Sequence, residues 1–205
     1  DIVLSISDFT NILYITSPDQ KKKKYQLMIE FKNGGYLVFS VAMYGGIMAF
    51  REMLDNVYYT GSLNSVSPLS NAFDESYFGK LFSGVTKDLS MKAFLSTEQR
   101  IPGLGNGVLQ DILFNAGLHP KSKMSTLSDF NKEELYHSLK VTLNKMTDRG
   151  GRDTEKDFYG EPGGYKTLLS KNTYKDPCPN CGETIVKQAY MGGAVYYCPE
   201  CQILK

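Results

Sequence analysis

The sequence predicts an α+β protein in which antiparallel strands are followed by a helical region and a C-terminal β-hairpin. Three observations lead to this prediction. Near the N-terminus, apolar and polar residues alternate, which is typical of half-buried strands. In the middle of the chain, apolar residues recur every three or four positions, as on one face of a helix. At the end, two Cys-x-x-Cys pairs flank a short stretch of β-forming residues.

The four cysteines of the 205-residue chain form two pairs, Cys178 with Cys181 and Cys198 with Cys201, separated by sixteen residues. Each pair presents two sulfurs from one tight turn, and two such turns supply the four ligands of a tetrahedral Zn²⁺ site. Four thiolates leave no open coordination position, so we expect one structural zinc ion without a part in chemistry. The alternatives are two disulfides, which suit short secreted chains, and a thioredoxin-like redox pair, which does not need a second pair.

A β-hairpin is predicted between the two cysteine pairs. Residues 184–189 and 195–197 are β-forming, and the sequence Met-Gly-Gly-Ala at 191–194 lies between them. Glycine tolerates the positive φ angles of a tight turn, so we expect these glycines at the hairpin tip.

The N-terminal part predicts strands at 11–16, 25–31 and 36–41. Asn33 and Gly34 predict a type I′ turn between the second and third of these strands. Asp1 begins the chain in what reads as the middle of a strand. We therefore expect a fragment of a longer protein whose earlier strands are absent.

The helical region contains two predicted helices joined by a Pro/Gly turn. The first is expected to end near Gln99, and the second to begin at about Asn106 and to end before Gly117. The sequence Gly-Leu-Gly-Asn-Gly at 103–107 bares backbone N–H groups at a helix start, which is an anion-binding geometry. The alternative is that the glycines only turn the chain and that Asn106 caps the helix.

A further helix is predicted after these two. Asn131 and Glu134 have the spacing of a capping box. The apolar stripe that follows is expected in the core, and its members are Leu135, Leu139, Leu143 and Met146. Before the helical region, the Ser/Asn/Pro-rich stretch at 62–69 reads as a linker between domains.

Composition is ordinary for a globular protein, and no apolar run is long enough to span a bilayer. The net charge of +1 is not the strong excess of positive charge that is typical of nucleic-acid-binding domains. Any nucleic-acid partner must therefore be argued from particular residues. Thiolate metal ligands argue for a reducing compartment, and we expect a cytoplasmic protein of the bacterial nucleoid type that has no membrane partner.

Two motifs in this order resemble the C-terminal half of the formamidopyrimidine-DNA glycosylase / endonuclease VIII family. The first runs from Gln99 through the Pro/Gly turn to Asn106 and along the helix that follows. The second is the four-cysteine hairpin that ends at Gln202. The resemblance is strong over residues 90–202 and looser over residues 25–50.

The resemblance implies a partial antiparallel β-sandwich at 1–62, a helix–two-turns–helix DNA-binding domain at 70–172 and a zinc-finger hairpin at 173–205. It implies base-excision repair, in which a glycosylase removes an oxidised base from duplex DNA and cleaves the strand as an AP lyase. The nucleophile of the family is the amine of an N-terminal proline. Because this chain begins with Asp1, we expect no catalytic residue in it and no cleavage. We also expect a monomer that binds damaged duplex DNA.

The resemblance carries DNA contacts over to individual positions. Asn106 matches the phosphate-binding asparagine of the family, supported by the N–H groups around Gly105 and Gly107. Tyr44 matches an aromatic residue that wedges into the base stack, as base flipping requires.

Two cationic contacts of the family are absent here, because Ala42 and Gly193 stand where arginines are usual. Each lost phosphate contact removes about one unit from the salt dependence of binding. Lys187 on the hairpin and Lys166 or Arg152 before it are candidates to substitute in part. The losses give weight to an alternative, a non-catalytic zinc-ribbon module that binds DNA or RNA.

A glycine-rich stretch at 150–165 joins the helical region to the hairpin. In the family this region approaches the damaged base, and the alternative is a flexible connector. Arg152, Asp153 and Glu155 are candidates to read base edges if the loop is ordered against DNA.

Overall fold

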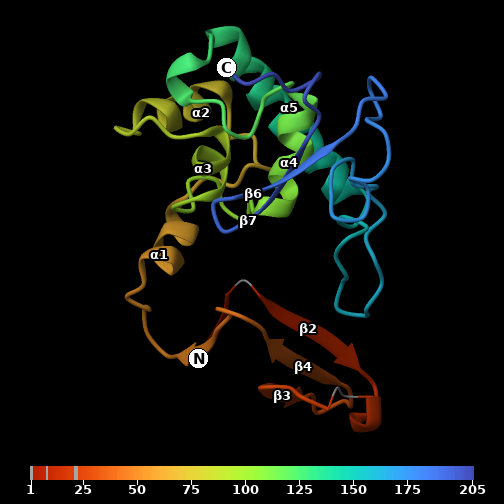
Figure 1. Ribbon diagram of the computed structural model, residues 1–205. Helices are drawn as coiled ribbons and strands as arrows, with labels where there is room; N and C mark the ends of the chain where they lie inside the picture. The colour runs from red at the N-terminus through yellow and green to blue at the C-terminus, as the bar shows by residue number, and fades with distance from the viewer. Residues whose placement is uncertain (1, 8, 21–22) are drawn as a thin grey trace. The chain divides into compact units, whose positions relative to one another are not determined.

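The computed structural model describes residues 2–7, 9–20 and 23–205, and it confirms the α+β class (Figure 1). Asp1, from which we expected missing strands, lies outside these residues. By its internal contacts the chain divides into two units, Asp1–Asp55 with Arg149–Tyr165 and Asn56–Asp148 with Lys166–Lys205. This division joins the hairpin to the helices and the glycine-rich loop to the N-terminal strands, whereas the three domains expected from the sequence remain a prediction.

The N-terminal unit contains two small antiparallel sheets. In the first, β1 (Val3–Ile6) pairs with β5 (Ile47–Phe50). In the second, β4 (Tyr36–Val41) lies between β2 (Thr10–Ile15) and β3 (Leu27–Glu30). The three predicted strands correspond to β2, β3 and β4, with ends that shift by up to two residues.

The turn between β3 and β4 differs from the predicted type I′ turn. That turn type needs positive φ at Asn33 and Gly34, whereas the structure has positive φ at Gly34 (83°) and Gly35 (92°). The N–H of Phe31 donates to the carbonyl of Gly35, so the hairpin closes around a longer loop. The hairpin is confirmed, but the predicted turn type is wrong because the second of two consecutive glycines also takes a left-handed position. A short 3₁₀ helix, η1 (Pro18–Gln20), follows β2.

The glycine-rich loop of this unit, Arg149–Tyr165, folds back on itself. The N–H of Gly164 donates to the carbonyl of Arg149 at 2.8 Å, and the N–H of Tyr165 donates to that of Gly151 at 2.9 Å. Gly163 packs so closely on Gly151 that a Cβ atom at Gly163 would overlap the Gly151 backbone. A flexible connector is therefore not what the structure contains.

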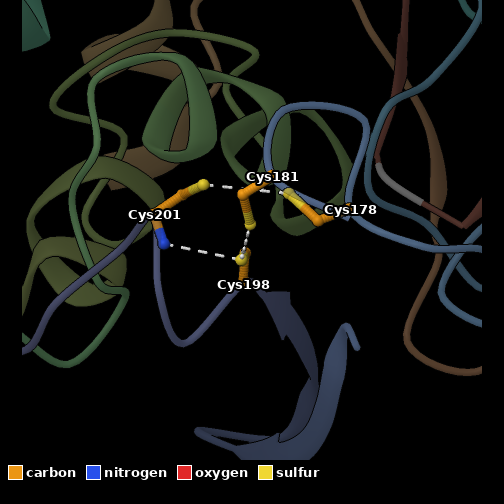
Figure 2. A group of neighbouring side chains, drawn as sticks. All are labelled: Cys178, Cys181, Cys198 and Cys201. Carbon is orange, nitrogen blue, oxygen red and sulfur yellow. Dashed lines mark hydrogen bonds between the residues drawn. The ribbon is translucent and has the colours of Figure 1, made fainter. Parts of the chain in front are cut away.

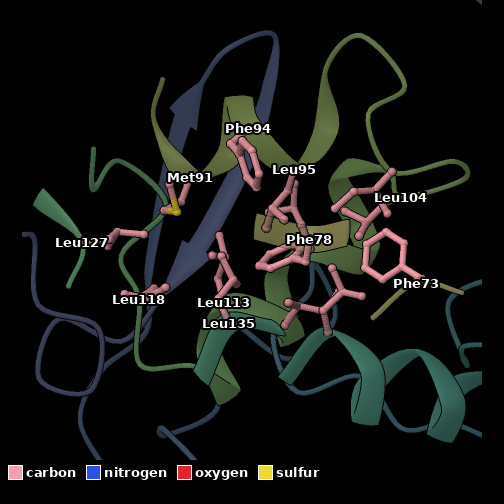
Figure 3. Close-up of a cluster of buried hydrophobic side chains, with 14 residues drawn as sticks. Phe73, Phe78, Met91, Phe94, Leu95, Leu104, Leu113, Leu118, Leu127 and Leu135 are labelled. Atoms are coloured by element: carbon pink, nitrogen blue, oxygen red, sulfur yellow. The ribbon is translucent and has the colours of Figure 1, made fainter. Parts of the chain in front are cut away.

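The larger unit contains five α-helices and the 3₁₀ helix η2, and α2 to α5 share one buried core (Figure 3). Their bounds are α1 (Val57–Asn64), α2 (Glu75–Ser83), α3 (Met91–Ser96), α4 (Asn106–Asn115), η2 (Met124–Thr126) and α5 (Asp129–Asp148). The predicted stripe of α5 faces this core, since Leu135, Leu139 and Met146 are buried and Leu143 is half-buried. Within the described ranges, no helix has the length and apolarity needed to cross a membrane.

The start of α5 corrects one prediction. The N–H of Asn131 donates to Ser128 Oγ at 3.2 Å, and the N–H of Ser128 donates to Asn131 Oδ1 at 3.4 Å. This reciprocal pair is a capping box one turn earlier than the predicted pair of Asn131 and Glu134. The prediction is wrong because Ser128, three residues before Asn131, is the residue that caps the helix. Asn131 then lies within the first turn, where its side chain completes the capping box.

The end of α4 agrees with the sequence. Gly117 has a φ of 62°, and the N–H of Leu118 donates to the carbonyl of Leu113 at 2.9 Å. This six-to-one bond, with the bond from Gly117 to the carbonyl of Phe114, is a Schellman motif, which needs a left-handed residue after the last helical turn. The chain therefore leaves α4 sharply toward Pro120.

The C-terminal hairpin pairs β6 (Val186–Tyr190) with β7 (Gly193–Tyr197). Its two tip residues, Met191 and Gly192, have φ angles of 49° and 73°, as a type I′ turn requires. The predicted hairpin is confirmed, with Gly192 at the tip and Gly193 in the first position of β7. In Figure 1 this hairpin lies beside α4.

The contact of Gly163 with Gly151 gives a first test of the fold. We expect Gly163→Ala to lower the free energy of unfolding by about 1–3 kcal/mol, because the added methyl group overlaps main-chain atoms that cannot move aside cheaply. Urea unfolding followed by circular dichroism measures this change. The control is Gly46→Ala in the same unit, where the added Cβ meets Ser7 Oγ at an ordinary 3.5 Å. Equal losses in the two variants would contradict the close packing.

Candidate metal centre and nucleic-acid interface

The four cysteines come together at the base of the hairpin (Figure 2), and their Sγ atoms all lie within 4.8 Å of one another. Cys178 Sγ is 3.8 Å from Cys201 Sγ, and Cys181 Sγ is 3.5 Å from Cys198 Sγ. Four sulfurs at 2.3 Å from a tetrahedral zinc ion would be about 3.8 Å apart. Because a disulfide needs about 2.05 Å, the alternative of two disulfides is wrong. The cluster has the size and donor set of a metal site.

The surroundings of these thiols shift their pKa values in opposite directions. Burial alone raises the pKa of Cys178, but backbone N–H groups of Cys181 and Asn180 outweigh it and lower that pKa to about 7. Burial raises the pKa of Cys198 to about 12. Four neighbouring thiolates repel one another, so the fully deprotonated set is stable only with a positive ion among them.

Gln202 joins the second cysteine pair to the helical core. It is buried, and its Oε1 accepts a hydrogen bond from the N–H of Cys198 at 3.0 Å. Its Nε2 donates to the carbonyl of Leu118 at 2.8 Å, at the end of the Schellman motif. The position of these ligands therefore depends on how α4 ends.

Asp111, in the middle of α4, holds the segment that leads into the first cysteine pair. Its buried carboxylate accepts hydrogen bonds from the N–H groups of Leu168 and Leu169 at 3.0 and 2.9 Å. Sequence reasoning missed this contact, because the partners lie far along the chain. Both ends of the cysteine hairpin are thus fixed to the same helix.

The start of α4 is open to a ligand. Gly105 is the N-cap, no side chain caps the helix, and Asn106 is the first helical residue. The alternative in which Asn106 caps the helix is therefore wrong. Its Nδ2 instead donates to the carbonyl of Ala194 at 3.1 Å, and a Cβ at Gly193 would lie 3.4 Å from the same nitrogen. The structure thus brings Asn106 and Gly193 together, with Gly105 and Gly107 beside them in the chain.

Two lysines that sequence reasoning missed lie at the same end of the hairpin. Lys92 is only 3% exposed, and its Nζ donates to the carbonyl of Tyr190. Burial lowers its pKa, and it has no carboxylate partner within the described part of the chain. Lys121 Nζ lies 5.2 Å from the centre of the Tyr190 ring. Two positive charges therefore flank the strand that leads to the tip.

The other predicted residues each have their own surroundings. Lys187 lies over the ring of Tyr174 at 5.0 Å. Arg152 is buried in the N-terminal unit and pairs with Glu155, which neutralises its charge. Tyr44, in the turn before β5, is 89% exposed.

The comparisons with known proteins agree with this arrangement. The chain is 31% identical over 204 residues to the formamidopyrimidine-DNA glycosylase of Histophilus somni (strain 2336), and the match covers 97% of the chain and 73% of that relative. No family model matches the chain.

Two solved structures have the same fold at 22% sequence identity. The MutM (Fpg) protein from Thermus thermophilus has a TM-score of 0.82, covering 100% of this chain and 77% of that chain. The complex between the Lactococcus lactis Fpg and an abasic site containing DNA has a TM-score of 0.80, covering 99% and 76%.

An α+β chain whose helical unit carries a four-cysteine hairpin beside an open helix start has the architecture of the DNA glycosylases that it matches. The chain belongs to the formamidopyrimidine-DNA glycosylase family, as the two motifs in its sequence led us to expect. Its match extends over nearly the whole chain, including the N-terminal strands where the resemblance was looser.

His119, just after α4, gives a pH test of the packing around this site. It is buried against the ring of Tyr197, and burial together with the nearby Lys121 cation lowers its pKa. The folded protein therefore keeps this histidine neutral at a pH where the unfolded chain binds a proton. The contribution of neutral His119 to the free energy of unfolding is therefore complete above about pH 6.5, and it is lost as the pH falls below that value.

We expect His119→Gln to lose less stability than the parent protein between pH 7 and pH 5.5, by about 1 kcal/mol. Urea unfolding at both pH values with saturating zinc measures the difference. His137→Gln, which changes an exposed histidine on α5, is the control and should retain the loss of the parent protein. Identical pH dependence in all three proteins would show that His119 is not kept neutral.

Proposed function

We propose that this chain binds damaged duplex DNA as part of a glycosylase and AP lyase that removes oxidised bases. One observation carries the proposal: the hydrogen bond from Asn106 to Ala194 joins the open start of α4 to the hairpin tip. These are the two elements through which the family is expected to hold DNA. The abasic site containing DNA in the complex of the Lactococcus lactis relative supports this choice of partner.

We propose one structural zinc ion held by Cys178, Cys181, Cys198 and Cys201. The spacing of the sulfurs and the all-thiolate donor set support this choice. The ion, when bound, supplies positive charge that stabilises the thiolates and fixes the base of the hairpin. The free thiols suit a reducing compartment such as the cytoplasm, where we expect the protein to act as a monomer.

Positive charge near the hairpin tip supports phosphate binding despite the missing arginine at Gly193. The Nζ atoms of Lys92 and Lys121 both lie near Tyr190, at 5.9 and 5.2 Å from the centre of its ring, and neither lysine has a carboxylate partner among the described residues. Asn106 adds a side-chain donor beside the bare N–H groups of the helix start. Together these groups form a phosphate-binding surface around the start of α4.

The exposed turn between β4 and β5 is our candidate for the wedge that fills the space of a flipped base. Tyr44 is 89% exposed, and Met43 beside it is 77% exposed with a φ of 51°. A non-glycine residue held in the left-handed region often marks a functional turn. Met43 is therefore a second wedge candidate, which the sequence did not single out.

Removal of the metal tests the proposed zinc site. We expect one zinc ion per chain by elemental analysis, and loss of at least about 4 kcal/mol of stability in Cys181→Ala, because a ligand to a structural metal is removed. The control is Glu200→Ala, an exposed residue between two ligands that offers no sulfur. A zinc-free parent protein of unchanged stability would contradict the site.

DNA binding tests the proposed function. We expect the protein to bind a duplex with an abasic-site analogue more tightly than an undamaged duplex, with an affinity that falls as salt rises. Asn106→Ala should bind roughly tenfold more weakly, because a hydrogen bond to a charged phosphate is lost. Fluorescence anisotropy at several salt concentrations measures both effects.

The control for this experiment is Asn115→Ala at the other end of α4, where the carboxamide bonds only to Thr142 Oγ1. It should bind as the parent protein does. Equal affinity for damaged and undamaged duplex would favour the non-catalytic binding module, and no salt-dependent binding would contradict both functions.

A further inference from the structure

The hairpin presents one main-chain edge of β7 to α4. In an antiparallel pair of strands, hydrogen-bonded and non-hydrogen-bonded residue pairs alternate. Val195 and Gln188 form a hydrogen-bonded pair, so the N–H and carbonyl groups of the neighbouring residues Ala194 and Tyr196 point away from β6. This second edge is largely shielded from solvent, since Tyr196 is buried at 8% exposure and Ala194 is half-buried. Buried backbone groups need hydrogen-bond partners, and β6 cannot supply them.

Gln110 supplies those partners from the second turn of α4. Its Oε1 accepts a hydrogen bond from the N–H of Tyr196 at 3.1 Å, and its Nε2 donates to the carbonyl of Ala194 at 3.2 Å. Its Nε2 also donates to the carbonyl of Asn106 at 3.0 Å. The side chain is 2% exposed, so this carboxamide pairs with β7 as a short third strand would.

Asn106 and Gln110 share one acceptor, the carbonyl of Ala194. The carboxamide of Asn106 is held by this bond alone within the described structure, since its Oδ1 accepts nothing. Gln110, in contrast, is fixed by three hydrogen bonds. When Asn106 turns its amide to a phosphate, Gln110 still satisfies the carbonyl that Asn106 leaves.

We propose that Gln110 is a positioning residue, which holds the hairpin in register on α4 and frees the amide of Asn106 for a DNA phosphate. This inference rests on the proposed function, because it assigns Gln110 a part in DNA binding by the same site. Without Gln110, Asn106 would be the sole donor to Ala194. If the amide turned from Ala194 toward a phosphate, this half-buried carbonyl would then be left without a donor, which carries an energetic cost.

The test uses Gln110→Met, which keeps the size and flexibility of the side chain and removes its hydrogen bonds. Affinity for a duplex with an abasic-site analogue is measured together with zinc content and melting temperature. We expect a folded, zinc-loaded variant that binds about tenfold more weakly than the parent protein. Asn115→Ala is again the matched control, since it removes a carboxamide from the same helix without touching the hairpin.

Combining Gln110→Met with Asn106→Ala separates a positioning role from a merely structural one. In the Asn106→Ala background, phosphate binding no longer competes for the Ala194 carbonyl, so Gln110→Met should weaken binding by less than about twofold. For the melting temperature we expect the reverse: Gln110→Met should lower it more in the Asn106→Ala background than in the parent protein. The doubly substituted protein has no side-chain donor for the Ala194 carbonyl, whether DNA is bound or not.

Two results would overturn the inference. One is a Gln110→Met variant that binds DNA within twofold of the parent protein. The other is a doubly substituted protein whose loss of DNA affinity equals the product of the losses in the two single variants. A failure of the parent protein to bind DNA would instead contradict the proposed function. The two failures are therefore distinguishable. If Gln110→Met loses its zinc, Gln110→Glu replaces it, because its carboxylate keeps the acceptor for Tyr196 and removes the donors to the carbonyls of Ala194 and Asn106. The same substitution in the Asn106→Ala background controls for the negative charge that the carboxylate adds.

Discussion

The buried main-chain edge of β7 is the constraint on which the larger unit depends. An unpaired backbone group in the interior is costly, so the hairpin is stable only where α4 presents the carboxamides that match this edge. The same contact places the hairpin tip beside the open start of that helix. Asp111 and the Schellman turn at Gly117 fix the rest of the cysteine hairpin to α4. One helix thus organises both the cysteine cluster and the surface that we propose for DNA binding.

Local patterns were sufficient to predict the ligands and the elements that carry them. The cysteine spacing, the glycines of the tip and the helix start at Asn106 each depend on residues close together in the sequence. The lysine and glutamine of the site could not be found this way. Lys92 meets Tyr190 across 98 residues, and Gln110 meets Ala194 across 84 residues. No periodicity in either segment encodes such a pair, because it exists only after the core has placed the hairpin.

The errors of the sequence analysis have a similar cause. At the β3–β4 turn, two adjacent glycines offer more than one turn geometry, and the strand register decides between them. At α5, both Ser128 and Asn131 are good capping residues, and the longer helix is the one that forms. The loop Arg149–Tyr165 lies between α5 and the cysteine hairpin in the sequence, yet its contacts group it with the N-terminal strands. A local sequence is often compatible with several turn or capping geometries, and tertiary packing determines which of them forms.

Peptide groups of β7 take part in attaching the hairpin to the helical unit, beside buried side chains such as Val195 and Tyr196. An amino-acid replacement at Gly193, whose own peptide groups are not in these bonds, leaves the bonds in place. The atoms nearest to a Cβ atom at Gly193 would be Asn106 Nδ2 at 3.4 Å, Asn106 Cγ at 3.6 Å and Lys92 Nζ at 3.6 Å, all at ordinary contact distances. The charge at the tip can therefore be changed by a replacement at Gly193, while the hydrogen bonds that hold β7 on α4 stay the same.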